Sequence, residues 1–277
     1  MLAFIIRRIG QSILVLLVVG LVAFSMFNFV GDPIDNMLGQ ERTAEDIARL
    51  REQLGLDQNF FVQYFRFLQE AIQGNFGVSY RQGRPVTDIL LERAPATLEL
   101  AAVSGVLAIV FGIALGVFTA IRRNGVWANV IMSASLIGVS LPTFLIGILL
   151  IYVFSVELGW LPSFGRGDVV EIGGWKTGFL SESGLKALIL PSITLGLYQM
   201  TLIMRLVRSE MLEVLRQDYI RFARARGLKD RAVNFHHALK NTMVPVITVI
   251  GLQLGAIIAF AIITETVFQW PGVGLLF

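Results

Sequence analysis

The chain has 277 residues, of which 55% are hydrophobic and 16% are charged, and its formal net charge is +3. Soluble domains carry about a quarter charged residues, so this composition excludes an ordinary soluble protein and indicates a polytopic membrane protein. There is no cysteine, which excludes disulfides and thiolate metal sites. The apolar residues form long blocks instead of alternating, and this pattern favours membrane helices over a transmembrane barrel.

Five runs without any charged residue are each long enough for a membrane helix, because a bilayer core of about 30 Å needs roughly 20 helical residues. These runs are residues 9–31, 100–121, 124–156, 187–204 and 241–264. The third run is long for one span, but Trp127 and Pro142 provide a start and a bend. The sequence therefore predicts an all-α integral membrane protein, a polytopic helix bundle with five spans.

The loops between these runs differ in charge. Arg7 and Arg8 precede the first run, Arg122 and Arg123 separate the second from the third, and residues 208–241 contain eight Lys or Arg against four acidic residues. Residues 32–93 contain seven Arg and ten acidic residues, and residues 157–186 contain three basic and four acidic residues. The positive-inside rule then places the N-terminus and the basic loops in the cytoplasm and the two acidic loops outside.

This topology divides the chain into three parts. Residues 1–31 are a cytoplasmic N-terminus with the first span, residues 32–95 are an external loop with short helices, and residues 96–277 are a core of four spans. The alternative for the N-terminus is a cleaved signal peptide. The apolar run is too long for that, and no A-x-A site follows, so a retained anchor is the preferred interpretation.

The external loop contains two helix signals. Thr43-Ala-Glu-Asp46 is typical of a helix N-cap, and this helix is expected to end near Leu54-Gly55. Residues 58–73 form a second segment that is rich in aromatic side chains, namely Phe60, Phe61, Tyr64, Phe65 and Phe67. These side chains could line a docking surface for a soluble partner. The preferred interpretation is a helix on the membrane surface or packed on the spans.

No arrangement of residues predicts an enzyme. The stretch Gly174-Trp-Lys-Thr177 lacks the glycine before the lysine that a P-loop requires. His236 and His237 are the only histidines, and as neighbours they point to different faces of a helix, so a metal site is not predicted. Glu265 stands at a membrane edge with no obvious partner. We expect a chain without catalytic residues and without a cofactor of its own.

The loop of residues 208–241 has a pattern of its own. Leu212, Leu215, Tyr219 and Phe222 recur at spacings of three, four and three, which predicts an apolar stripe along one helical face. Gly227 follows and is expected to end this helix in a left-handed conformation. Asp230 is expected to cap a second short helix that runs towards Lys240. The prediction is a helix, a glycine break and a second helix.

Such an element suits a docking surface. Ala223 and Ala225 would let another surface approach closely, and the flanking arginines offer charge-assisted bonds to carboxylates. The alternative is a solvated basic loop of the kind that the positive-inside rule predicts. A short loop would satisfy that rule, whereas a two-helix element with an apolar stripe needs a protein to cover it, so docking is the preferred interpretation.

These residues also resemble a known family. Asp218-Tyr-Ile-Arg-Phe-Ala-Arg-Ala-Arg-Gly-Leu228, then His237-Ala-Leu-Lys-Asn241 and Pro245, resembles the cytoplasmic signature loop of binding-protein-dependent ABC importer permeases, within them the dipeptide/oligopeptide/nickel branch. Other segments agree in order and spacing: Arg7-Arg8, Gly31-Asp-Pro33, Gln53-Leu-Gly-Leu-Asp57, Gly74-Asn-Phe-Gly77, Ala96-Thr-Leu-Glu-Leu100 and Thr264-Glu-Thr-Val-Phe-Gln-Trp-Pro-Gly272.

The resemblance implies that residues 208–241 form the coupling helices that seat on a separate ATPase subunit. Ala223 and Gly227 match the typical small residues of the family. Arg221 and Lys240 replace an acidic residue and a proline, as is common in the peptide branch. The implied ATPase-coupling residues are Tyr219, Arg221, Ala223, Arg224, Ala225, Gly227 and Lys240.

The resemblance also implies partners and a location. The expected partners are a homologous second permease, two ATPase subunits that bind ATP and Mg, and a periplasmic substrate-binding protein, all at the bacterial inner membrane. The expected cargo is a di- or oligopeptide, with glutathione and nickel chelates as alternatives. Family members usually have six spans, so the last span is expected to be missing here.

Polar or bend-forming residues within the predicted spans are candidates for a translocation path, namely Ser140, Pro142, Gln199, Thr201 and Gln253. Each is equally consistent with an interhelical bond or a packing adjustment. An autonomous channel or secondary transporter is a competing function, but such proteins commonly place ionisable residues in mid-membrane, and these spans have almost none. A scaffold in a membrane complex is the third alternative.

Overall fold

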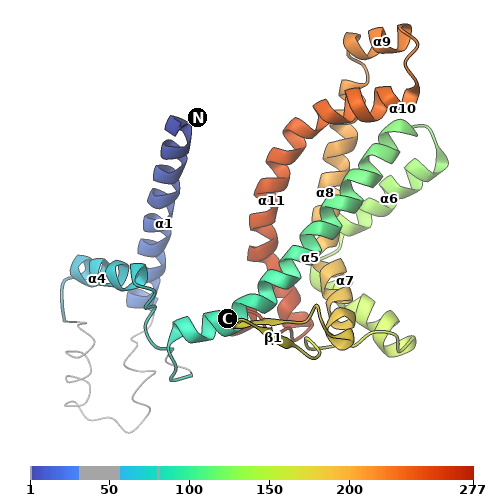
Figure 1. Ribbon diagram of the computed structural model, residues 1–277. Helices are drawn as coiled ribbons and strands as arrows, with labels where there is room; N and C mark the ends of the chain where they lie inside the picture. The colour runs from blue at the N-terminus through green and yellow to red at the C-terminus, as the bar shows by residue number, and fades with distance from the viewer. Residues whose placement is uncertain (1, 31–56, 80–81) are drawn as a thin grey trace. The chain divides into compact units, whose positions relative to one another are not determined.

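The computed structural model describes residues 2–30, 57–79 and 82–277, and it is built almost entirely of helices (Figure 1). The chain divides into two compact units, residues 1–91 and 92–277. The expected helix over residues 43–55 lies outside the described residues. The segment Gly31–Pro33 also lies outside the described residues. The same is true of residues 53–56, the first four residues of the segment that ends at Asp57.

The first unit contains helices α1 (Leu2–Val30) and α4 (Phe60–Ile72). α1 corresponds to the first predicted span. α4 confirms the helix expected over residues 58–73, and it begins where the side chain of Asn59 accepts a hydrogen bond from the backbone N–H of Phe61 at 3.0 Å. An Asn at this position satisfies one of the N–H groups that the first turn of a helix leaves without a partner.

The aromatic side chains of α4 are divided between its two faces. The ring of Phe24 on α1 lies 5.4 to 5.8 Å from the rings of three of them, Phe60, Tyr64 and Phe67. The hydroxyl of Tyr64 donates a hydrogen bond to the carbonyl of Leu17 at 2.6 Å. The structure thus supports packing on a span for one face of α4, while Phe61 and Phe65 on the other face are exposed.

The second unit contains three long helices: α5 (Val86–Ile121), which enters this unit at residue 92, α8 (Glu182–Val214) and α11 (Leu239–Val267). They lie side by side in Figure 1. Close approach of α5 and α8 depends on glycine, because a Cβ at Gly112 or Gly116 would lie within 3.0 Å of atoms of Ile203 or Val207. Small residues at helix crossings are typical of membrane bundles, where packing and not hydrophobic transfer drives association.

Two groups of buried side chains lie at opposite ends of this unit. At one end α5, α8 and α11 pack with the short helix α9 (Asp218–Ala225), and we call this the α9 end. At the other end the same three helices pack around Trp270, near a small β-hairpin, and we call this the hairpin end. The two ends carry the features that bear on function.

The third predicted span is broken in two. Helix α6 (Val126–Ser140) ends before Pro142, and α7 (Thr143–Leu150) continues into the π-helix η1 (Ile151–Glu157). The stretch of α7 and η1 lies at an angle of 109° to α6. The bend at Pro142 is confirmed, since proline cannot continue the hydrogen-bond ladder of α6. Residues 124–156 thus form two helices on either side of a sharp bend, and the pair counts either as one broken span or as a re-entrant loop.

Among the described residues, four helices are long and apolar enough to cross a membrane, or five if the pair of α6 and α7 counts as one span. One local departure from an all-helical chain is the hairpin of β1 (Val170–Ile172) and β2 (Trp175–Thr177). Its two-residue turn is Gly173-Gly174, and both residues have positive φ, as tight hairpins favour.

Candidate functional site

The element of residues 208–241 begins inside α8, which runs to Val214. The chain then leaves the helix over Leu215–Gln217, and α9 begins at Asp218 and lies across the α9 end (Figure 1). The predicted apolar stripe on a single helix was therefore wrong. Leu212 belongs to α8, whereas Tyr219 and Phe222 belong to α9, and the interruption changes the direction of the chain between them.

α9 has one face on the protein and one face in solvent. Ile220 is fully buried and Ala223 is 7% exposed, and both belong to the apolar cluster of the α9 end with Val233 of the following helix. Phe222, in contrast, is 64% exposed and Tyr219 is 43% exposed. The small side chain of Ala223 thus packs within its own chain, and the aromatic side chains lie toward solvent.

Gly227 ends α9 as the sequence predicted. Its φ is +77°, which is the left-handed conformation, and this conformation raises the free energy of any residue with a Cβ. The N–H of Leu228 donates to the carbonyl of Ala223 at 3.3 Å, and the N–H of Gly227 donates to the carbonyl of Arg224 at 2.9 Å. These two bonds form a Schellman motif, which satisfies carbonyls at the end of the helix.

The second helix of the element differs from the prediction. Its N-cap is Lys229, and Asp230 is the first helical residue, so the expected cap at Asp230 was wrong. The helix is also not short. α10 (Asp230–Ala232), the π-helix η2 (Val233–Ala238) and α11 form one continuous helical stretch of 38 residues.

One side-chain bond joins α9 to this long stretch. The amide nitrogen of Asn241 donates to the hydroxyl of Tyr219 at 2.8 Å, and it also donates to the carbonyl of His237 at 3.1 Å. An exposed ion pair of 3.3 Å between Arg221 and Asp218 lies on the solvent face of α9 and, as a surface pair, contributes little stability.

The structure brings most of the predicted coupling residues together. Six of the seven lie on α9 or in its C-terminal turn, and Lys240 is the second residue of α11, next to Asn241. Of these seven residues only Ala223 is buried, and Arg226 adds a further exposed guanidinium 5.7 Å from the ring of Phe222. The result is a basic and aromatic surface on a short helix with a defined end.

The five path candidates are not brought together. Ser140 and Pro142 are exposed at the break between α6 and α7, and Gln253 is half-buried on α11. Gln199 and Thr201 are buried within α8. They lie on at least three separate helices, so the structure of this chain by itself does not define a path.

Gln199 and Thr201 differ in their bonding. The hydroxyl of Thr201 donates to the carbonyl of Leu197 at 3.0 Å. This hydroxyl also packs closely on Gly138 of α6, since a Cβ at Gly138 would lie 2.9 Å from the hydroxyl oxygen. This contact is typical of helix packing. The side-chain carbonyl of Gln199 is buried and has no hydrogen-bond partner among the described residues. Of the five candidates, Gln199 has the stronger physical reason to expect a further contact.

Glu265 has partners that the sequence did not reveal. It is fully buried at the hairpin end, where the hydroxyl of Thr97 donates to one carboxylate oxygen at 2.5 Å and the N–H of Gly274 donates to the other at 2.6 Å. The N–H of Val273 donates to Thr97 at 2.8 Å, and the indole of Trp270 donates to the carbonyl of Ala96 at 2.9 Å. We call this network the Thr97–Glu265 latch. It joins two motif segments that lie 168 residues apart.

A buried ion pair fixes the hairpin to α5. Arg166 donates to the carboxylate of Glu99 at 2.6 Å, and their side chains are 7% and 2% exposed. Arg166 also donates to the carbonyl of Lys176, while the indole of Trp175 and the N–H of Gly178 donate to Glu99. The sequence did not predict this pair, since its one signal was a lone acidic residue beside a predicted span.

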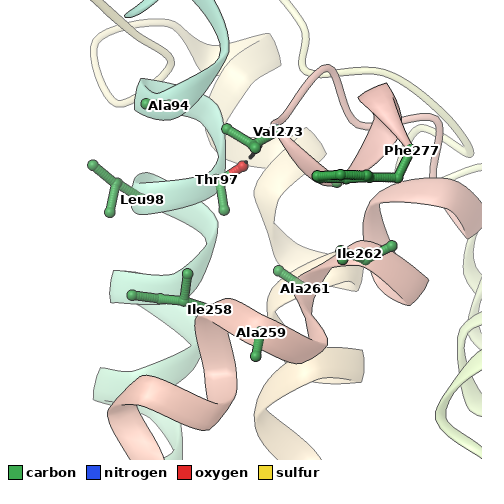
Figure 2. Close-up of a pocket in the computed structure, with 10 residues that line it drawn as sticks. Ala94, Thr97, Leu98, Ile258, Ala259, Ala261, Ile262, Val273 and Phe277 are labelled. Carbon is green, nitrogen blue, oxygen red and sulfur yellow. Dashed lines mark hydrogen bonds between the residues drawn. The ribbon is translucent and has the colours of Figure 1, made fainter. Parts of the chain in front are cut away.

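Beside the latch lies an apolar cavity of about 280 Å³ (Figure 2). α5 contributes Ala94, Thr97 and Leu98, and α11 contributes Ile258 and Ile262 among others. The hydroxyl of Thr97 is already bonded to Glu265 and Val273, so the lining offers a ligand little polar contact. None of the five path candidates lines this cavity.

Comparison with known families decides the identity of the chain. The family described as "Binding-protein-dependent transport system inner membrane component" matches residues 112–277, and the corresponding N-terminal family matches residues 1–101. The chain belongs to this family. It is the permease subunit of an ABC importer of the peptide type and a multi-pass inner-membrane protein, as the resemblance of its loop predicted.

Curated relatives match the permease over nearly its whole length. It is 41% identical to the di/tripeptide transport system permease protein DppB of Pseudomonas aeruginosa (strain UCBPP-PA14), over 99% of this chain and 86% of that protein. It is 39% identical to the glutathione transport system permease protein GsiC of Escherichia coli (strain K12), over 100% of this chain and 85% of that protein. The ATPase of such a transporter is a separate chain.

A solved structure confirms the fold. A chain of the MetNI methionine ABC transporter in an inward-facing conformation superposes with a TM-score of 0.52 and 20% sequence identity, and the match covers 68% of the permease and 78% of that chain. At this identity the likeness shows the fold alone, which is the helical bundle of the ABC importer permeases.

Proposed function

We propose that this permease carries short peptides across the inner membrane, and that α9 is the surface on which a separate ATPase subunit drives it. The observation that carries the proposal is the construction of α9. Its buried face is anchored by Ile220 and Ala223, its end is fixed by the Gly227 cap, and its exposed face carries Phe222 with several arginines. A helix that is anchored but not covered can receive a force and pass it on.

The proposed orientation places the α9 end in the cytoplasm. Eight of the Lys and Arg residues lie between residues 208 and 241, and the positive-inside rule then puts the hairpin end and the acidic loops outside. The N-terminus is cytoplasmic in the same scheme. ATP and Mg would bind to the two ATPase subunits, which would be reached only from the α9 side.

The proposed cargo follows from the relatives. Their names refer to di- and tripeptides and to glutathione, which is itself a tripeptide, at nearly equal identities of 41% and 39%. The shared chemistry is a short chain of amides with terminal charges. Nickel chelates are the remaining candidate. A periplasmic binding protein would deliver the peptide, and a homologous second permease would complete the path.

Within this proposal, the five candidates for the translocation path have different roles. Gln199 offers a buried amide carbonyl that has no partner in the described part of the chain, and this carbonyl suits an N–H of a peptide when a rearrangement exposes it. Ser140 and Pro142 are exposed at the break and Gln253 is half-buried on α11, which leaves all three accessible to the second permease. Thr201 is bonded within α8 and is assigned to packing or to the path wall.

The test of α9 is capture of the ATPase subunits by the purified permease. Phe222→Asp is expected to lower the amount of bound ATPase at least tenfold, because it places a charge where an apolar side chain would be desolvated. Phe164→Asp is the matched control, since Phe164 is similarly exposed, at 62% against 64%, but lies at the hairpin end. Equal capture by the two variants would exclude α9 as the docking surface.

The test of the cargo is transport by the complete importer in proteoliposomes. A labelled dipeptide in the presence of ATP and the binding protein is expected to accumulate, and unlabelled tripeptide is expected to compete. Accumulation of glutathione with no effect of peptides would assign the permease to glutathione. Uptake of any of these by the permease without an ATPase would contradict the importer mechanism.

A further inference from the structure

α9 has two routes through which its movement can reach α11, and they differ in stiffness. The covalent route passes through the turn at Gly227, then α10 and the π-helix η2, before it reaches α11 at Leu239. A left-handed glycine and a π-helical segment are both sites where the backbone can readjust. The covalent route is therefore the compliant one.

The second route is direct. The hydroxyl of Tyr219, in the first turn of α9, accepts a hydrogen bond of 2.8 Å from the side chain of Asn241, in the first turn of α11. This bond spans 22 residues of chain and omits both Gly227 and η2. Asn241 is itself held in place, because its amide nitrogen also donates to the carbonyl of His237 at 3.1 Å, one turn earlier in the helix.

The position of Tyr219 on α9 suits this bond. At 100° per residue, Tyr219 lies about 40° from Ala223 around the helix and about 60° on the other side from Phe222. It thus stands between the face that packs on the α9 end and the face that is exposed.

The contact point on α11 also matters. Pro245 lies four residues after Asn241 and has no N–H to donate to the Asn241 carbonyl, so the ladder of α11 has a gap at this turn. Prolines inside helices are the usual sites of bending. The Tyr219–Asn241 bond therefore reaches α11 just before the place where this helix can bend.

We infer that the hydrogen bond between Tyr219 and Asn241 is the strut that transmits displacement of α9 to the α9 end of α11, with Pro245 as the hinge. Tyr219 and Asn241 act as positioning residues and need not contact the cargo. This inference rests on the proposed function of α9 as the ATPase-docking helix. It adds Asn241 and Pro245 to the coupling machinery and gives the Tyr219 hydroxyl an intramolecular role.

The experiment uses the complete importer in proteoliposomes and measures peptide transported per ATP hydrolysed. Tyr219→Phe removes only the hydroxyl and Asn241→Ala removes only the amide. Each is expected to lower the ratio about three- to tenfold, the effect expected for one hydrogen bond. The transport ratio of the double variant is expected to equal that of the single variant with the lower ratio, because both changes remove the same bond. Asn241→Gln, which keeps the amide, is expected to recover part of the ratio.

The control removes a hydroxyl that has no such role. Thr248→Val deletes an exposed hydroxyl that donates to the carbonyl of Val244 at 3.4 Å, within α11 itself, and is expected to leave the ratio unchanged. A wild-type ratio in Tyr219→Phe and Asn241→Ala would overturn the strut. Additive losses in the double variant would also overturn it, since the two groups would then act separately.

Capture of the ATPase separates this inference from the function on which it rests. If Phe222→Asp abolishes capture while the Tyr219 and Asn241 variants transport normally, the docking function stands and the strut is refuted. If Tyr219→Phe itself lowers capture about tenfold, the hydroxyl bonds to the ATPase and not to Asn241, and the strut is again refuted. Retained capture with a lowered transport ratio is the result that the strut predicts.

Discussion

The Gly227 cap offers a test in which backbone strain can be separated from steric contact. Gly227 has a φ of +77°, and nothing lies within 4 Å of the position that a Cβ would occupy. The Cβ of a substituted residue therefore meets no neighbour within the described chain. Its cost is the left-handed conformation itself, about 1–2 kcal/mol for a residue with a Cβ.

This origin predicts an unusual order among variants. Gly227→Ala and Gly227→Leu are expected to destabilise the cap equally, since both place a Cβ in the left-handed conformation and that Cβ meets open space. Gly227→Asn is expected to cost less, because asparagine tolerates the left-handed region. A penalty of 1–2 kcal/mol corresponds to a change of about five- to thirtyfold in the population of the capped end.

Hydrogen exchange measures this effect without any partner. The N–H groups of Gly227 and Leu228 close the cap, so their protection is expected to fall about five- to thirtyfold in the alanine and leucine variants. In the complete importer, the transport ratio is expected to fall in the same order. Equal protection in the alanine and asparagine variants would refute the strain argument. A loss confined to leucine in the ATPase-bound complex would indicate a steric contact with the ATPase instead.

Three further predictions concern the helix packing and the hairpin end. Arg166→Leu leaves Glu99 as a buried charge without its ion-pair partner and is expected to cost about 3–5 kcal/mol, measured by thermal unfolding of the purified permease; a melting temperature equal to wild type would contradict burial of this pair. Thr97→Val removes one of the two donors to Glu265 and is expected to cost about 1–3 kcal/mol, whereas Thr97→Ser keeps the hydroxyl and is expected to cost less; equal melting temperatures would refute the latch. Gly116→Ala places a Cβ within 3 Å of Val207 and is expected to destabilise α5 against α8 by about 1–3 kcal/mol, and a neutral result would mean that the helices pack less closely.

The location of the membrane helices and the nature of the basic loop were predictable because both depend on local composition. The length and composition of an uncharged run predict that it crosses the membrane, whatever the helix packs against. The end of α9 at Gly227 was predictable for the same reason, since the left-handed conformation is a property of one residue. The family resemblance of residues 218–228 added the partner class.

Other features of the same loop were not predictable. Leu215, Arg216 and Gln217 contain neither glycine nor proline, so no local signal marks the interruption between α8 and α9. If the break is not recognised, the apolar stripe runs on through Tyr219 and Phe222 and is predicted to be the buried face. The face of α9 that is buried in the structure is instead the one that carries Ile220. Which face of an amphipathic segment is buried depends on the surface that it meets.

The sequence by itself determined that this is a polytopic membrane protein with a basic, helical loop, because hydropathy, charge bias and turn residues act over a few neighbouring positions. The tertiary structure alone decided which distant groups meet. The sequence offers no partner for Glu265, whereas the structure pairs it with Thr97, which is 168 residues away. In the same way, only the structure pairs Asn241 with the hydroxyl of Tyr219. The physical reason is that a hydrogen bond requires two atoms within about 3 Å, and only the packing of the helices brings these atoms together.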